Sequence, residues 1–374
     1  MEALMKKRKV AYIVSDVEKA LAFEWTAQSL ISEVDLSFIL IGKKNTSLSS
    51  YLKENNVSCI VVSDEEQPGN LNKWLKIYSI LRTEKPDVVH VHLWRAMLLG
   101  LSAAWVSGIK KRVLTRHHAT LHYVEYPSGR KWDLLCNALA TDIIAISENI
   151  KDIVILRDGA KHSKVHVIHH GFEFSYFRDI DRERIDSIRE KYRLYSRPII
   201  GVISRYVKFK GVQYIIPAFK KIRFEFPEAH LVLANAQGDY TAEIRSILKQ
   251  LPEGSYTEIQ FEDDLAALYK VFDVFVHVPI DAQAEAFGQT YVEALAAEIP
   301  SIFTLSGVAR EFIKDKENAL VVNFKDDEGI FWGIKTLLVD EKKRCGIVKN
   351  GFDSLTSKFD LRIMIDKLVE IYTT

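Results

Sequence analysis

The residues best suited to chemistry in this chain are two carboxylates eight positions apart, Glu285 and Glu293. Between them, Phe287 and Gly288 lead into an apolar run with helical character that extends to position 297. Glycine suits a turn that opens a helix, and it lets backbone N–H groups come close to a ligand. We therefore expect Glu285 at the end of a loop and Glu293 about two turns inside a helix. Such a pair can hold a sugar and a ribose, with a phosphate at the amides between them. A surface loop before an ordinary amphipathic helix is the alternative, because helix starts favour acidic residues.

A second motif follows the β-branched run 199–203, where Arg205 and Lys210 stand just before Gly211. A loop at the C-terminal end of a strand can direct both cations to one anion, and the glycine lets the next helix begin close to it. Cations at this place would neutralise the charge that develops on a departing diphosphate, which lowers the barrier. A solvated basic turn is the alternative, and we expect Lys208 to be solvated in either case.

Histidines end two successive strand-like runs in the first half of the chain. His90 and His92 lie in one run, and His117 and His118 close the next. Ligands of parallel α/β sheets bind beyond the C-terminal strand ends, so one of the latter pair is expected to face a site. We expect His90 to be a core residue. A metal bound by His92, His117 and His118 is a weaker alternative, because no carboxylate or cysteine with ligand spacing accompanies them.

Short β-branched runs alternate with helical patterns along all 374 residues, which is typical of parallel strands joined by helical crossovers. The length suits two domains, and a break is expected near residue 195, where a charged helical segment gives way to a new buried strand. Helices are expected at 211–224 and 289–297. The strands are expected at 10–15, 36–41, 59–62, 88–92, 113–117, 143–146, 165–169, 199–203, 231–234, 258–261, 274–278, 302–305 and 320–322.

Composition narrows the class of protein further. Hydrophobic residues make up 48% of the chain, which is enough for two cores, and no apolar run reaches the length of a membrane span. The three cysteines are far apart, which favours a reduced, cytoplasmic location. The chain lacks a Gly-x-Gly-x-x-Gly fingerprint, a P-loop and a Gly-x-Ser-x-Gly elbow, which argues against dinucleotide oxidoreductases, P-loop NTPases and serine hydrolases. Basic clusters are not interleaved with aromatic residues, so no nucleic-acid partner is expected.

Net charge is +1, but basic residues are concentrated in the first half and acidic residues in the second. Two dense basic clusters are 6–9 and 110–112. A basic domain is compatible with an anionic surface or substrate, and we expect Lys110, Lys111 and Arg112 to support peripheral attachment to the inner face of an anionic membrane. Solvated surface charge is the alternative for each cluster.

Together these motifs resemble those of a known family. Glu-x7-Glu with Phe-Gly after the first Glu resembles the donor-site signature of retaining GT-B glycosyltransferases of family 4, the glycosyl transferases group 1. The Arg and Lys-Gly after the run 199–203 look like the basic pair of that family. Residues 146–148, 165–173 and 306–311 are also similar to family segments. The resemblance covers nearly the whole chain and is strongest over 199–323.

The resemblance implies an α/β protein of the GT-B fold, with two doubly wound, Rossmann-like domains facing across a cleft. The acceptor-side domain would occupy 1–195 and the nucleotide-sugar donor domain 196–355. A C-terminal helix within 356–374 would cross back to the first domain.

The implied activity is retaining, metal-independent transfer of a hexose from a nucleotide-diphosphate sugar to an acceptor hydroxyl. The acceptor would be a glycan or lipid-linked, in cell-surface polysaccharide or glycolipid synthesis, and no cofactor would be needed. The implied catalytic residues are Glu285, Arg205, Lys210 and His117, the last beside the donor sugar. The implied donor-binding residues are Glu293 at the ribose, the amides of Phe287, Gly288 and Gln289, and Thr290, Gly211 and Glu311.

Two other functions stay open. One is a nucleotide-sugar epimerase of the same fold, and the other is a GT-B module that binds a nucleotide sugar or a partner without turnover. The second is compatible with a departure from the family, because residues 15–24 stand where the family has a glycine pair. A glycoside hydrolase is less expected, since its two carboxylates must flank one bond within about 5–10 Å.

Overall fold

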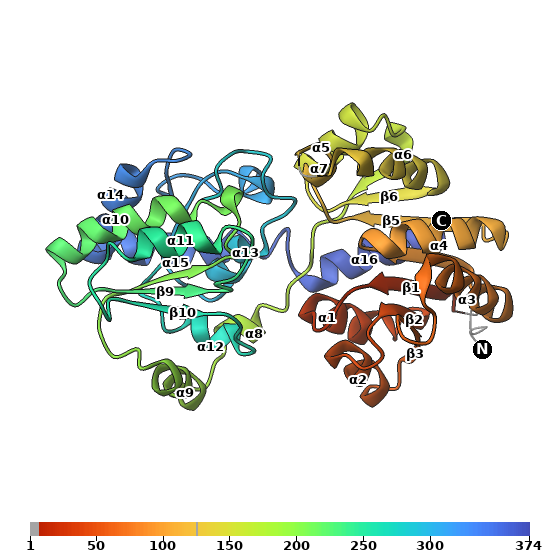
Figure 1. Cartoon of the computed structure of the whole chain (residues 1–374), viewed down its shortest axis with the longest axis horizontal. Helices are drawn as coiled ribbons and strands as arrows, with labels where there is room; N and C mark the ends of the chain where they lie inside the picture. Colours follow the sequence, from red (N-terminus) through yellow and green to blue (C-terminus); the bar gives the residue numbers. More distant parts are fainter. Residues whose placement is uncertain (1–6, 125) are drawn as a thin grey trace. The chain divides into compact units, whose positions relative to one another are not determined.

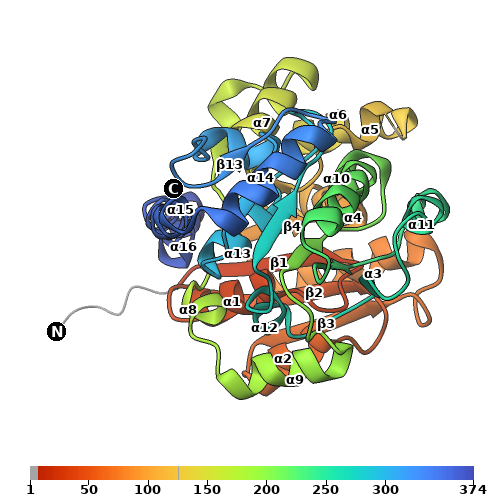
Figure 2. The same ribbon diagram turned by 90° about the vertical axis from the view of Figure 1, so that its left-hand side faces the viewer.

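The computed structural model of the chain describes residues 7–124 and 126–374. Its contacts divide the chain into two units (Figures 1 and 2). The first unit combines Met1–Phe172 with Phe359–Thr374, and the second is Glu173–Lys358. Each unit is an all-parallel sheet with helices as its crossovers.

The first unit contains a seven-stranded sheet in the order β3-β2-β1-β4-β5-β6-β7. Its central strands are buried along almost their whole length, as expected for parallel strands covered on both faces. The strands are β1 (Lys9–Ser15), β2 (Asp35–Gly42), β3 (Ser58–Ser63), β4 (Val88–His92), β5 (Lys111–Arg116), β6 (Asp142–Ala145) and β7 (Val165–Val167). The helices are α1 (Leu21–Leu30), α2 (Ser47–Glu54), α3 (Gly69–Glu84), α4 (Trp94–Val106), α5 (Leu121–Val124), α6 (Arg130–Leu139), α7 (Glu148–Asp152) and α16 (Leu361–Thr373), with short helical turns η1 (Pro127–Gly129), η2 (Ile153–Arg157) and η3 (His162–Lys164).

The second unit contains a six-stranded sheet in the order β10-β9-β8-β11-β12-β13. Its strands are β8 (Ile199–Ile203), β9 (His230–Ala234), β10 (Tyr256–Ile259), β11 (Val274–His277), β12 (Ser301–Phe303) and β13 (Leu320–Val321). Its helices are α8 (Ser175–Arg178), α9 (Arg182–Tyr192), α10 (Val212–Glu225), α11 (Thr241–Leu248), α12 (Leu265–Tyr269), α13 (Gln289–Ala296), α14 (Asp327–Val339) and α15 (Glu341–Asp353), with turns η4 (Lys208–Lys210) and η5 (Gly307–Glu311).

The predicted fold class, α/β with two doubly wound parallel sheets, is confirmed, and each predicted strand overlaps an observed one. The expected division at residue 195 lies inside the second unit, because α9 belongs to that unit. Arg184 makes two hydrogen bonds to Asp264, of 2.7 and 2.8 Å, and Tyr192 donates one of 2.6 Å to Glu262. The charged helix therefore packs on the unit that follows it.

Helix α16 completes the core of the first unit. Ile365, Leu368 and Ile371 are buried in the same apolar cluster as the strand residues of β1 and β2. The Tyr372 hydroxyl lies 2.6 Å from both the Tyr12 hydroxyl and His90 Nδ1. None of the helices in the described part of the chain combines the length and apolar character that a membrane crossing requires.

Candidate active site

The second sheet has its topological switch point between β8 and β11, since chain order runs outward from β8 on one side and from β11 on the other. Loops that follow these strands diverge, and ligands of open α/β sheets bind in the opening between them. Lys210 follows β8, Glu285 follows β11 and Ser306 follows β12. The sequence motifs of the second half therefore meet at one edge of one sheet.

Lys210 and Glu285 form an ion pair in this opening. Lys210 Nζ lies 2.5 Å from Glu285 Oε1, and both side chains are largely buried. Burial is the largest single effect and would raise the pKa of Glu285, but Lys210 and His277 together outweigh it and hold that pKa at about 2. Glu285 is thus a carboxylate at any physiological pH. The backbone N–H of Glu285 donates to the Ser306 hydroxyl at 3.1 Å, which anchors the end of the loop.

Gly211 allows the two loops to approach so closely. It has a φ of 78°, and a Cβ at this position would lie 1.9 Å from the carbonyl oxygen of Val278. No other residue fits here without moving the backbone. Two residues before it, the carbonyl of Phe209 accepts a hydrogen bond from the N–H of Ile280 at 2.9 Å. These contacts hold Lys210 against the loop that carries Glu285.

Helix α13 carries the second carboxylate. Gly288 has a φ of 88° and caps the helix start, as its sequence position predicts. Glu293 lies little more than one turn inside α13, so the predicted depth of two turns is wrong. Its Oε2 accepts a 2.9 Å hydrogen bond from the Tyr269 hydroxyl, and burial raises the pKa of Glu293 to about 7. The two carboxylates of the motif therefore have opposite electrostatic environments.

The first turn of α13 carries an unused polar atom. The Thr290 hydroxyl is buried and has no hydrogen-bond partner within the described residues. Phe287 is buried, and its carbonyl accepts a 3.0 Å hydrogen bond from Val308 N–H, so its side chain belongs to the core. Gln289 is exposed. A buried hydroxyl at a helix N-terminus suits an anionic ligand, because the first amides of a helix also point there.

Two residues of the predicted site, Arg205 and Glu311, stand apart from the ion pair. Arg205 is exposed, and its side chain makes no ion pair or hydrogen bond with any residue that the structure describes. Lys208 is likewise exposed, as predicted. Glu311 ends η5 and is partly exposed, and its carbonyl accepts a 2.8 Å hydrogen bond from Lys358.

Two neighbours of the carboxylates were not predicted as site residues. His277, the last residue of β11, lies with Nε2 3.2 Å from Glu285 Oε1. Tyr269, the last residue of α12, orients Glu293. Burial lowers the pKa of His277, so the imidazole is neutral beside the carboxylate. In the sequence His277 ends an apolar strand and Tyr269 ends an apolar helix. Neither position therefore indicates a role in the site.

The histidines of the first unit separate into two groups. His117 lies directly after β5, with Nε2 3.1 Å from His92 Nδ1, and its ring stacks on that of His170 at 5.5 Å. Burial, and then the neighbouring histidines, lower the pKa of His117 well below its ordinary value, so it is neutral. His90 is the expected core residue, since Nε2 lies 2.7 Å from the Thr115 hydroxyl and Nδ1 contacts Tyr372.

His118 belongs to a separate network around the buried Asp133. His118, His122 and Asp133 offer ligand atoms within 4.8 Å of one another, which is the spacing of a metal site. However, one Asp133 oxygen already accepts from Arg116 at 2.6 Å and lies 2.7 Å from His122. A guanidinium at this distance opposes a cation, so the geometry favours a hydrogen-bonded network. The set also differs from the His92, His117 and His118 considered from the sequence.

The loop after β1 stands where the family has a glycine pair, and one of its residues adopts a backbone conformation that favours glycine. Asp16 adopts a φ of 57°, a conformation that is unusual outside glycine. Its carboxylate accepts a 2.6 Å hydrogen bond from Arg95, which also binds Asp64 at 2.5 Å. An arginine held by two carboxylates thus lies at the C-terminal edge of the first sheet.

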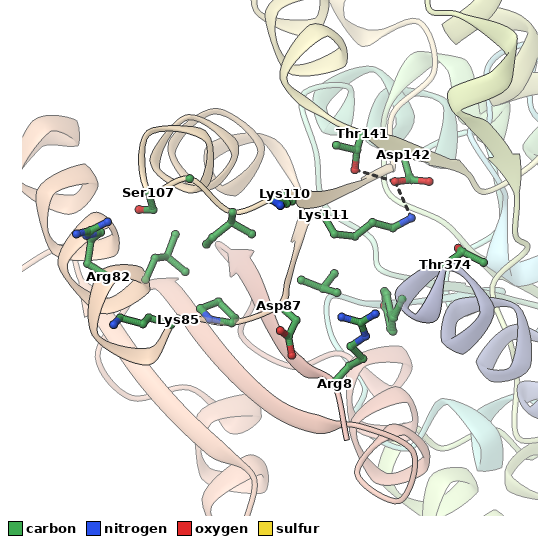
Figure 3. Close-up of a pocket in the computed structure, with 16 residues that line it drawn as sticks. Arg8, Arg82, Lys85, Asp87, Ser107, Lys110, Lys111, Thr141, Asp142 and Thr374 are labelled. Atoms are coloured by element: carbon green, nitrogen blue, oxygen red, sulfur yellow. Dashed lines mark hydrogen bonds and ion pairs between the residues drawn. The ribbon is translucent and has the colours of Figure 1, made fainter. Parts of the chain in front are cut away.

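The basic cluster 110–112 lies at the opposite edge of that sheet, beside a pocket of about 600 Å³ (Figure 3). Lys111 pairs with Asp142 at 3.1 Å. Arg112 donates to the carbonyls of Leu139 and Ile109, at 2.7 and 2.5 Å. Only Lys110 of the three is a free exposed cation within the described residues, so the cluster is largely part of the fold.

Comparisons with known proteins identify the family of this chain. Residues 184–353 match the family model Glycosyl transferases group 1, and residues 49–176 match the model Glycosyltransferase Family 4. The chain belongs to the family 4, group 1 glycosyltransferases. It is 26% identical to the capsular polysaccharide biosynthesis glycosyltransferase CapM of Staphylococcus aureus, over 99% of this chain and 98% of that protein. It is 23% identical to the lipopolysaccharide core biosynthesis glycosyltransferase LpsE of Rhizobium meliloti, over 79% and 78% of the two chains.

Solved glycosyltransferases share the fold. The crystal structure of Anabaena HepE in complex with UDP and glucose superposes with a TM-score of 0.84, at 18% identity, over 98% of this chain and 100% of that one. Sucrose-phosphate synthase from Thermosynechococcus elongatus superposes with a TM-score of 0.76, at 15% identity, over 98% of both chains. This family 4 glycosyltransferase therefore has the GT-B fold.

Proposed function

We propose that this glycosyltransferase moves a hexose from a nucleotide-diphosphate sugar to an acceptor hydroxyl with retention of anomeric configuration. The observation that carries the proposal is the cluster of Lys210, Glu285 and Glu293 at the switch point of the second sheet. A buried cation, a permanently ionised carboxylate and a helix N-terminus are the groups that a diphosphate linked to two sugars would need.

Lys210 is the group best placed to stabilise the leaving diphosphate. An ammonium has three N–H donors, and Glu285 occupies one of them, so two remain for phosphate oxygens. Arg205, exposed on the same loop, would add a second cation when the diphosphate binds. Two cations supply the charge that a metal would otherwise supply, and we propose metal-independent catalysis on this ground.

Glu285 would accept hydrogen bonds from hydroxyls of the donor sugar. Its low pKa and its pairing with Lys210 make it a poor proton acceptor, so a general-base role for it is disfavoured. In a front-face reaction the departing phosphate oxygen takes the proton of the acceptor hydroxyl, and no protein base is required. His117, whose lowered pKa keeps its imidazole neutral, is proposed as a sugar-binding residue on the family resemblance alone.

The donor and acceptor classes follow from the relatives. HepE binds UDP and glucose, and we propose a UDP-hexose as the first donor to test. CapM and LpsE are named for capsular polysaccharide and lipopolysaccharide core synthesis. We accordingly propose a glycan or lipid-linked acceptor of the cell surface, used from the cytoplasmic side.

The proposal can be tested with a panel of UDP-, GDP-, ADP- and dTDP-sugars in a thermal unfolding assay. A ligand at 100 times its dissociation constant raises the free energy of unfolding by about 2.7 kcal/mol. We expect one nucleotide class to raise Tm in the wild type and much less in Lys210→Ala. A panel that leaves Tm unchanged throughout would contradict the proposal.

Replacing Glu293 with glutamine should weaken nucleotide binding without weakening the fold. The loss of charge-assisted hydrogen bonds to the ribose costs about 1.5–3 kcal/mol, or about 10- to 150-fold in Kd. Burial raises the folded-state pKa of Glu293 to about 7, above its ordinary 4.5, so its ionisation lowers stability as pH rises between these values. Glutamine can still accept from Tyr269 and has no charge to bury, so Tm at pH 8 should hold or rise.

Titration calorimetry with the nucleoside diphosphate measures this change, with Glu298→Gln as the control. Glu298 follows the same helix but is exposed. An unchanged Kd in a folded Glu293→Gln variant would remove the assigned role.

A further inference from the structure

Helix α6 of the first unit has its polar face turned inward. Asp133 and Asn137, one turn apart, are buried. Asp133 accepts from Arg116, and Asn137 Nδ2 lies 3.5 Å from the buried Asp158. Because this charged network occupies the inner face, the large apolar residues of the helix are left on its outer side. The usual arrangement of an amphipathic surface helix is thereby reversed.

The outward face of α6 is accordingly apolar. Trp132, Leu134 and Leu135 are 38%, 41% and 40% exposed. Beside them, Leu156 in η2 is 78% exposed, and a hydrogen bond of 3.2 Å from Arg130 to the carbonyl of Arg157 joins η2 to α6. In Figure 1 this helix lies above β6 at the margin of the first unit. Large apolar side chains gathered in this way mark an interaction surface.

The exposed charges within the two segments that build this face are of one sign, and the exposed carboxylate of Asp152 lies just before the second segment. Segments 126–139 and 153–161 carry the cations Arg130, Lys131, Arg157 and Lys161. Their two carboxylates, Asp133 and Asp158, are both buried on Arg116. Lys131 lies over the Trp132 ring at 5.3 Å, so cation and aromatic ring occupy the same part of the surface. Within these two segments no acidic side chain is exposed.

We propose that the outer face of α6, with η2, is a docking surface for an anionic lipid bilayer. Trp and Leu side chains with flanking Lys and Arg are the groups that insert at the interface between headgroups and acyl chains. The cations would contact anionic headgroups while Trp132, Leu135 and Leu156 enter the interface. A second copy of this chain fits less well, because a two-fold contact would bring cations of one sign together.

This surface replaces the cluster 110–112 as the membrane contact, since Lys111 and Arg112 are used within the fold. The inference goes beyond the proposed function, and binding to vesicles can be measured whether or not the protein transfers a sugar.

Vesicle flotation with the full-length protein tests the proposal, using phosphatidylglycerol–phosphatidylcholine vesicles and vesicles of phosphatidylcholine alone. We expect the wild type to float with the anionic vesicles at low salt and to be released as salt rises toward 1 M, where the Debye length falls to about 3 Å. The double variant Lys131→Glu with Leu135→Ser should lose binding by about tenfold or more.

The matched control is Lys220→Glu with Phe224→Ser on α10. It has the same charge change and the same spacing of four residues on an exposed helix face, and Phe224 is 90% exposed. It should float like the wild type, and both double variants should keep wild-type Tm.

Absence of wild-type flotation, or an equal loss in both double variants, would overturn the proposal. So would equal binding to phosphatidylcholine alone. Sedimentation velocity without lipid gives a further test. A dimer that Lys131→Glu with Leu135→Ser dissociates would assign this face to a second copy of the chain instead.

Discussion

Replacing Lys210 with alanine is expected to lower turnover of the nucleotide sugar by about 10²- to 10³-fold. The ammonium is largely buried beside Glu285, and its interaction with the diphosphate strengthens as the sugar bond breaks. Turnover is measured with the donor that the nucleotide-sugar panel identifies. Arg205→Ala should act in the same direction. Lys210→Arg, which keeps the charge but changes its geometry, should retain more activity than Lys210→Ala.

Lys208→Ala is the matched control for this loop, because Lys208 is exposed two residues away in the same turn. It should keep turnover close to that of the wild type. Small and equal effects at positions 205, 208 and 210 would show that the loop is only a solvated basic turn. Circular dichroism of each variant separates lost chemistry from lost structure, since removing Lys210 leaves a buried carboxylate without its ion-pair partner.

Glu285→Gln should destabilise the second unit as well as impair catalysis. Breaking one partner of a buried ion pair typically costs about 3–5 kcal/mol, because the remaining charge stays buried without compensation. Thermal or urea unfolding at pH 7 measures the loss. Glu298→Gln, at an exposed carboxylate, should leave the free energy of unfolding within about 0.5 kcal/mol of the wild type.

The difference in unfolding free energy between the wild type and Glu285→Gln should depend on pH, and the pKa of Glu285 fixes its sign. The folded-state pKa of Glu285 is about 2, below its ordinary value of 4.5. Its contribution to stability is therefore fully present above pH 4.5 and is lost as pH falls from there toward 2. The gap between wild type and Glu285→Gln should narrow over this range. A gap that is constant with pH would mean that the ion pair does not stabilise the unit.

The fold could be predicted from the sequence because parallel strands buried on both faces are continuous apolar runs, as in β8. The site of the second unit could be predicted for a related reason. Lys210 and Glu285 each lie in the loop that follows a strand. Gly211 and Gly288 indicate the turns in these two loops. The residues of this site could therefore be identified from motifs that are local in the sequence.

The features that were missed depend on contacts between distant residues. Arg184 ties α9 to Asp264, so the division between units precedes that helix although charge and hydropathy change after it. His277 approaches Glu285 only through the path of the loop between them. The inward polar face of α6 exists because Arg116 and Asp158 lie beneath it, and no spacing within 130–139 reveals those partners.

The configuration of the sugar released from the donor tests the central claim most directly. Without an acceptor, water serves as a slow substitute, and proton NMR can follow the first free sugar before it mutarotates. For an α-linked donor, retaining transfer predicts that the α-anomer appears first, and that Lys210→Ala slows its release by about 10²- to 10³-fold while Lys208→Ala does not. First release of the β-anomer would contradict the account, and so would an epimerised nucleotide sugar or tight binding without any turnover.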